Sequence, residues 1–178
     1  MIIDEVQTGL GRCGEVWGID TYRVAPDIIV TGKGLSGGIY PISATLYAEH
    51  LDRFLHDNPF IHISTFGGAE AGCYVAMEVL EMLEEPGFLE HICRVAQVFQ
   101  QGFAELLAKH PGVLVEARQR GLMMGLKFID PGCGPWMTAA GFQAGLLTIY
   151  ANNDPSVIQI LPPLIIQEAE ARQVLGLL

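Results

Sequence analysis

Lysine and charge in general are scarce in this chain. Only three lysines, Lys33, Lys109 and Lys127, occur in 178 residues, and charged residues make up 17% of the sequence. The formal net charge of −10 argues against nucleic acid or an anionic membrane as a partner, because both repel an acidic surface. No apolar run reaches the length of a membrane-spanning helix, so we expect no membrane association.

Paired cysteines and clustered histidines are also missing. The four cysteines lie far apart and fit neither a disulfide framework nor a zinc knuckle. The five histidines have no metal-ligand spacing. We therefore expect reduced thiols, no metal site and a cytoplasmic protein.

Hydrophobic residues make up 50% of the sequence, which predicts a substantial core. Apolar runs and turn residues predict the following strands: 1–4, 27–31, 42–47, 61–65, 113–117, 122–129, 147–150 and 157–161. Helices are expected at 49–58, 70–84, 92–107, 139–144 and 167–178, and helix 70–84 reads as buried on most sides. This alternation favours an α/β fold.

The change in pattern near Pro86 predicts two domains, residues 1–85 and residues 86–178. The first residues read as a strand already under way, and the last helix stops while still apolar. We therefore expect the chain to be a piece of a longer protein, truncated at the end of its second domain.

Two short glycine motifs match patterns of other enzyme classes, but the flanking strands or helices that those patterns require are not predicted here. Residues 9–14 match the dinucleotide-binding pattern G-x-G-x-x-G, but polar residues 5–8 separate the strand from the glycines and no amphipathic helix follows. Residues 34–38 match the G-x-S-x-G elbow of serine hydrolases, which needs a helix directly after Ser36. Gly37, Gly38 and Pro41 prevent that helix, so Ser36 is interpreted as a turn hydroxyl.

The third motif joins Lys33 with Asp4. Asp4 ends one predicted strand and Lys33 follows another. The carboxyl ends of strands are where α/β sheets gather their ligand groups. A lysine between glycines at such an end suits imine chemistry with an aldehyde cofactor, whose ring nitrogen a carboxylate would keep protonated. The alternatives are a lysine that simply reaches solvent and an aspartate that caps a turn, with Glu5 as a solvated neighbour.

Several separated blocks resemble the class III aminotransferases, which depend on pyridoxal 5′-phosphate. They keep the order and spacing of the family and are residues 4–12, 26–27, 32–34, 37–38, 64–68, 120–123 and 161–164. The resemblance implies the carboxyl-terminal half of a subunit: part of the fold type I large domain, in residues 1–85, and a small α+β carboxyl-terminal domain, in residues 86–178. It also implies a homodimer.

By this resemblance, Lys33 forms the internal aldimine with the cofactor and moves the proton during transamination. Asp4 is expected to pair with the pyridinium nitrogen, and Gln7 to donate to the phenolic oxygen of the ring. Thr65 is expected to reach the cofactor phosphate of the other subunit. Arg12 and Arg120 are assigned structural roles, and Glu5 is considered as a residue that supports the cofactor-facing side chains from behind.

One departure from the family concerns the substrate. Gln159 stands where relatives usually have an arginine that clamps the substrate carboxylate. Losing a charge-assisted pair could cost about 1.5–3 kcal/mol of binding. We therefore hypothesise an amine or ω-amino donor and a keto acid acceptor, with an ornithine- or acetylornithine-type transaminase as the alternative.

Two further readings stay open. A mutase or racemase could use the same scaffold, although Gln7 and the intact run of residues 4–9 favour transamination. A non-catalytic remnant is the other reading. The amino-terminal portion of the family supplies the phosphate loop and the ring that stacks on the pyridine. We expect these 178 residues alone to be inactive.

Overall fold

The computed structural model describes residues 1–178, whose contacts divide the chain into two compact units, residues 1–89 and 90–178. The division falls just inside the second of two long helices, α2 (Glu70–Glu84) and α3 (Phe88–Lys109). The sequence places its domain boundary near Pro86, in the turn between these helices. The assignment of residues 1–85 and 86–178 to two functional domains stays a prediction.

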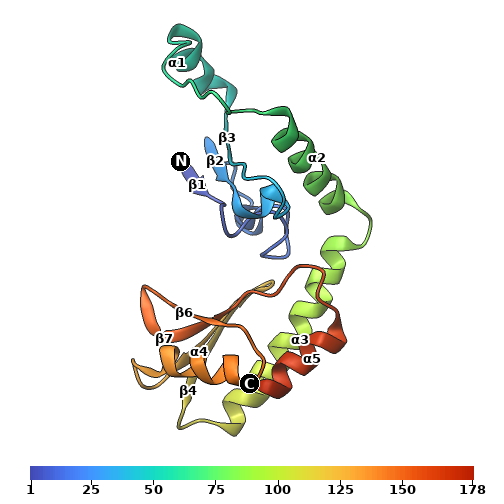
Figure 1. The fold of residues 1–178 in the computed structure, drawn as a ribbon, viewed down its shortest axis with the longest axis vertical. Coiled ribbons are helices and arrows are strands. Elements are labelled where there is room, and N and C mark those ends of the chain that lie inside the picture. The colour runs from blue at the N-terminus through green and yellow to red at the C-terminus, as the bar shows by residue number, and fades with distance from the viewer. The chain divides into compact units, whose positions relative to one another are not determined.

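The first unit is built on a three-stranded sheet of β1 (Ile2–Asp4), β2 (Ile28–Thr31) and β3 (Ala44–Tyr47), in that order (Figure 1). Isoleucine and valine dominate β1 and β2, and their branched side chains favour extended backbone. β1 runs parallel to β2, with Asp4 opposite Val30, whereas β3 is antiparallel. The chain therefore leaves β1 and β2 at the same edge of the sheet.

Short helical turns and two helices connect these strands and follow them. They are η1 (Gly18–Tyr22), η2 (Lys33–Ser36), η3 (Glu49–Leu51), α1 (Asp52–Asp57) and α2. Leu10, Leu35 and Leu83 form the buried core of this unit, and Trp17 and Ile42 are among the side chains packed against it. The core thus joins the loop after β1, the turn η2 and the end of α2.

Two predictions for the first unit are wrong. Residues 61–65 form no strand, because β3 pairs only with β2 and leaves this short apolar segment without a partner. Helix α2 has the predicted bounds but is not buried on most sides: only Gly72 and Leu83 are buried, and Tyr74 is 70% exposed. The reason is that α2 packs mainly on η2, which covers one face of the helix.

The second unit contains a four-stranded antiparallel sheet in the order β4-β5-β7-β6. Its strands are β4 (Leu114–Arg120), β5 (Met123–Phe128), β6 (Ile149–Ala151) and β7 (Asp154–Ile160), and its helices after α3 are α4 (Cys133–Gln143) and α5 (Glu168–Leu177). Helix α4 lies against β6 and β7 (Figure 1). It begins six residues before the predicted start at 139, because Pro135 falls in its first turn, where proline is tolerated.

The core of the second unit comes from α3 and the strands. Helix α3 buries a stripe at helical spacing, which includes Ile92, Val95, Phe99 and Phe103, and this confirms most of the apolar face that the sequence predicts. Leu126 and Ile158 are buried in the sheet. The amide of Gln119 on β4 donates to the carbonyl of Ala96 at 2.7 Å, which fastens the sheet to the helix.

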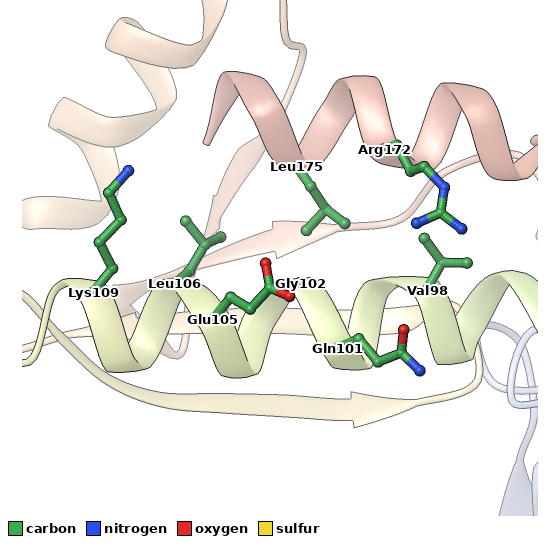
Figure 2. A pocket seen from close by; sticks show the side chains of 8 residues that line it. All are labelled: Val98, Gln101, Gly102, Glu105, Leu106, Lys109, Arg172 and Leu175. Atoms are coloured by element: carbon green, nitrogen blue, oxygen red, sulfur yellow. The ribbon is translucent and has the colours of Figure 1, made fainter.

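Helix α5 packs on α3 at Gly102. A side chain at position 102 would begin 2.4 Å from Leu175 Cδ1, so any larger residue there would require the Leu175 side chain to shift. A groove of about 340 Å³ lies between the two helices, as Figure 2 shows, and its lining residues are Val98, Gln101, Gly102, Glu105, Leu106, Lys109, Arg172 and Leu175.

Candidate active site

Lys33 stands directly beyond the end of β2 in a strained backbone conformation. Gly32 continues the extended chain, and Lys33 then opens the turn η2 with a φ of 42°. A non-glycine residue in this left-handed region costs about 1–3 kcal/mol and persists only where its surroundings enforce it. Such strain is concentrated at functional positions, and here it sets the direction in which the exposed lysine side chain leaves the sheet.

Gln7 is the residue that meets the lysine amine. Lys33 Nζ donates to Gln7 Oε1 at 2.7 Å, across 26 positions of sequence. Gln7 follows β1, and the parallel pairing of β1 with β2 brings the two side chains to the same edge of the sheet. The structure therefore joins two of the predicted site residues.

Asp4 belongs to the same edge. It is the last residue of β1, lies opposite Val30, and has an exposed carboxylate. Its Oδ1 accepts the backbone N–H of Val6 at 3.0 Å, and Oδ2 has no protein partner. The turn role considered from the sequence is thus real for one oxygen, while the other remains available to a ligand.

A cavity of about 350 Å³ adjoins the lysine and is lined by Lys33, Ser36, Gly38, Ile39, Tyr40, Pro41 and Ile42. Ser36 Oγ donates to the carbonyl of Lys33 at 2.7 Å and accepts the N–H of Gly38 at 3.1 Å. Ser36 is therefore a turn hydroxyl, as predicted. A Cβ placed on Gly38 would meet no atom within 4 Å, so the turn leaves open space beside the lysine.

The burial of Glu5 is the feature of this site that the sequence reasoning did not predict. The interpretation of Glu5 as a solvated neighbour of Asp4 is wrong, because its side chain is only 1% exposed. Its carboxylate accepts hydrogen bonds from the Thr8 hydroxyl, from Gly18 N at 3.1 Å and from Ile19 N at 2.7 Å. Strand alternation, which turns Glu5 away from Asp4, was the available signal.

Two further predicted site residues belong to other segments of the chain. Thr65 is exposed in the irregular segment between α1 and α2, and no recorded hydrogen bond joins it to Asp4, Gln7 or Lys33. Gln159 is half-buried on β7 in the second unit, opposite Gly125 on β5 and Ile149 on β6. Their roles toward a ligand stay predictions.

The glycine motif at 9–14 folds into consecutive turns and leads into no α-helix, which confirms that the dinucleotide-binding arrangement is not formed. Arg12, within this motif, is half-buried, and burial lowers the pKa of its guanidinium. No group of three or more histidine, cysteine, aspartate or glutamate side chains is placed to hold a metal ion. Every helix is too short or too polar to cross a membrane.

The sequence profile of the family described as aminotransferase class-III matches residues 1–178. The chain belongs to the class III aminotransferases. It is 52% identical over 170 residues to an uncharacterized aminotransferase of Archaeoglobus fulgidus, which covers 96% of this chain and 40% of the relative. This class III chain therefore spans about two fifths of that relative's length.

Solved structures agree with this assignment. A structure of Plasmodium falciparum ornithine delta-aminotransferase superposes with a TM-score of 0.89 at 32% identity, over 99% of this chain and 44% of that one. An acetylornithine aminotransferase from Elizabethkingia anophelis gives a TM-score of 0.89 at 30% identity, over 99% of this chain and 43% of that one. The α/β fold is thus that of part of a fold type I transferase, as the sequence predicts.

Class III aminotransferases use pyridoxal 5′-phosphate, and the residues at the β1–β2 edge fit this group. The fit rests on three observations: an amine and an amide in contact, a carboxylate oxygen without a protein partner on the adjoining strand, and open space beside the lysine. A primary amine and a carboxylate are the two groups that an aldehyde cofactor with a basic ring nitrogen requires.

Proposed function

We propose that this chain is the cofactor-lysine part of a pyridoxal-phosphate-dependent aminotransferase, which moves an amino group from an amine or ω-amino compound to a keto acid. The observation that carries the proposal is the contact between Lys33 and Gln7 beside Asp4, where two parallel strands end. The groups come from adjoining strands, so the sheet itself sets their spacing.

Pyridoxal 5′-phosphate, when bound, supplies an aldehyde that reacts with primary amines and a ring that withdraws electrons from the substrate carbon. Lys33 Nζ would hold the cofactor and would carry the proton that leaves the substrate carbon. The Asp4 carboxylate would keep the ring nitrogen of the cofactor protonated, and Gln7 would help to orient the ring. The strained backbone at Lys33 directs the amine and so reduces the reorientation needed at each step.

The same proposal includes a homodimer, with Thr65 bound to the cofactor phosphate of the other subunit. The exposure of Thr65, which leaves its hydroxyl accessible to a second subunit, supports this role. Sedimentation of the complete natural polypeptide should give twice the subunit mass.

For the chain by itself, we propose that residues 1–178 do not transaminate. Lys33 is exposed, and its cavity is lined by a single segment of chain between residues 33 and 42. Proton transfer at a substrate carbon needs a site that excludes water, and this open cavity does not provide one.

The amino donor follows from Gln159. An amide offers no cationic pair to a carboxylate, which favours donors without one. An ornithine- or acetylornithine-type donor is the second candidate, and it is favoured by the structural relatives named for those substrates.

Gln159→Arg in the complete natural polypeptide tests the choice of donor. It should raise the ratio of kcat/KM for an amino-acid donor over a simple amine about 10- to 100-fold, the equivalent of a charge-assisted pair. Gln143→Arg, at an exposed glutamine on α4, should leave the ratio unchanged. An unchanged ratio in Gln159→Arg as well would exclude the amine preference.

Trapping with borohydride tests the cofactor lysine. The complete natural polypeptide and residues 1–178 alone are incubated with pyridoxal 5′-phosphate, reduced to make any aldehyde–amine linkage permanent, and digested for mass spectrometry. The complete polypeptide should carry the label on Lys33, with residues 1–178 labelled more weakly. Lys33→Ala should abolish this label and Lys109→Ala should not. Equal labelling of all three lysines would refute the proposal.

A further inference from the structure

The buried carboxylate of Glu5 lies between the two residues that face the cofactor in the proposed function. Asp4 precedes it and Gln7 follows two positions later, yet the Glu5 side chain is 1% exposed and contacts neither the cavity nor the lysine amine. Burying a carboxylate is costly unless its oxygens accept hydrogen bonds. The Glu5 partners therefore indicate what the residue does.

Those partners close the loop that carries Gln7. Glu5 Oε2 accepts hydrogen bonds from the Thr8 hydroxyl and from Gly18 N, and Oε1 accepts one from Ile19 N. The carboxylate thus connects Glu5 to residues 13 and 14 positions later in the sequence. The Glu5 backbone is held as well, with its N–H donating to Val30 O at 2.7 Å and its carbonyl accepting Gly9 N at 3.0 Å. Glu5 thus ties residues 5–19 to β2.

The packing of this loop is tight around the same point. A Cβ on Gly18 would lie 3.1 Å from Glu5 Oε2, and a Cβ on Gly9 would lie 2.8 Å from Trp17 Cε3 and 2.9 Å from Glu5 O. Gln7 lies inside this closed segment, within two residues of Glu5 and Gly9. The backbone that carries the Gln7 amide is therefore held in place by the contacts of Glu5 and Gly9.

We propose that Glu5 is a positioning residue that, by fastening the loop of residues 5–19, sets where the Gln7 amide accepts the Lys33 amine. The inference deepens the proposed function and rests on it. A glutamine at position 5 has one acceptor oxygen, so its NH₂ would face either Ile19 N or the pair formed by the Thr8 hydroxyl and Gly18 N. Either arrangement loosens the loop without removing any group that faces the cavity.

Competitive acetylation of the lysines by acetic anhydride, without cofactor, reads the Gln7–Lys33 contact directly in residues 1–178. Lys109 serves as the internal reference. Gln7→Ala removes the acceptor from the Lys33 amine and should raise the Lys33:Lys109 acetylation ratio about three- to tenfold, as loss of a hydrogen bond of ordinary strength predicts. Glu5→Gln should raise it by a similar factor, while Lys127:Lys109 stays constant. Glu15→Gln, the same change at an exposed position of the same loop, should have no effect.

A double-mutant cycle separates positioning from general stabilisation. If Glu5 acts through Gln7, the Glu5→Gln change should add nothing to the ratio in the Gln7→Ala background. Thr8→Val, which removes one of the bonds to the carboxylate, should give a smaller increase that Thr8→Ser restores. If Glu5→Gln fails to fold, the comparison of Thr8→Val with Thr8→Ser tests the role of the Glu5 carboxylate instead.

Two results would overturn the inference: a Lys33 ratio in Glu5→Gln equal to that of the unmodified chain, or a full additional increase on top of Gln7→Ala. If Glu5→Gln does not fold, a Thr8→Val ratio equal to that of the unmodified chain would overturn it. Failure of the proposed function is distinct, since it would appear as absent pyridoxal phosphate trapping at Lys33 in the unmodified complete polypeptide. The acetylation result does not depend on that outcome.

Discussion

The two units of this class III chain differ in how they use their apolar residues. The second unit has a core of large buried side chains, in which Phe99 and Ile92 are 0% exposed and Phe103 is 1% exposed, although Trp136 at its surface is 79% exposed. The first unit holds the candidate site but leaves Phe60 and Phe66 at 82% and 80% exposure. Its interior is a small cluster around Leu10, Leu35 and Leu83.

The two units are therefore stabilised in different ways. An antiparallel sheet with helices packed against it gives the second unit a closed core. The first unit has three short strands, and specific polar contacts, such as those of Glu5, hold its functional loop in place of a large core. We therefore expect the second unit to carry most of the stability and the first unit most of the chemistry.

The largest expected effect is on the core of the second unit. Phe99→Ala should lower the free energy of unfolding by about 3–5 kcal/mol, because it removes a fully buried ring that packs 5.7 Å from the ring of Phe103. Denaturant unfolding followed by far-ultraviolet circular dichroism measures this change. Phe66→Ala, the same substitution at an exposed ring of the first unit, should change stability by less than about 0.5 kcal/mol. Equal losses in both variants would contradict the contrast between the units.

A substitution of a single methyl group tests how closely the second unit is packed. Gly134 lies in the first turn of α4, and a Cβ there would lie 2.2 Å from the backbone oxygen of Pro155. Gly134→Ala should therefore cost about 1–3 kcal/mol of stability, since the opposing atom is backbone and cannot rotate away. Thermal unfolding of this variant beside Gly112→Ala, whose Cβ meets no atom within 4 Å, checks the prediction.

The smallest effect concerns acid stability of the second unit. Hydrogen bonds from Ser156 and from Lys127 lower the pKa of Asp154 from 3.8 to about 2. A lowered pKa means that the folded state prefers the charged form, so this stabilisation is complete above about pH 4 and is lost as the pH falls toward 2.

Asp154→Asn should remove that part of the pH dependence while leaving the remaining acid unfolding in place. Amide hydrogen exchange of β5 and β7 in the parent chain and the variant, between pH 2 and pH 5, measures it. An identical pH dependence in both proteins would show that the carboxylate does not contribute.

Sequence reasoning succeeded where structure depends on neighbours in the chain. The bounds of α2, the stripe on α3 and the strand before Gly32 follow from local periodicity and turn residues. The choice of Lys33, Asp4 and Gln7 as site residues rests on short blocks of characteristic spacing and stays a prediction. The turn role of Ser36 followed from the two glycines after it.

Reasoning from local pattern failed where a residue depends on distant partners. Residues 61–65 have the apolar alternation of a strand but find no neighbouring edge, and α2 has apolar residues on a face that nothing in the chain covers. The burial of Glu5 was not predicted for the same reason, since its partners Gly18 and Ile19 lie 13 and 14 positions away.

The sequence by itself determined the family, the α/β class and the identity of the amine, the carboxylate and the amide at the candidate site. Tertiary structure alone decided that Lys33 Nζ meets Gln7 Oε1 and that Glu5 is buried. The physical reason is that residue type and local periodicity depend only on residues that are close in the sequence. A hydrogen bond across 26 positions, by contrast, exists only once two parallel strands have paired.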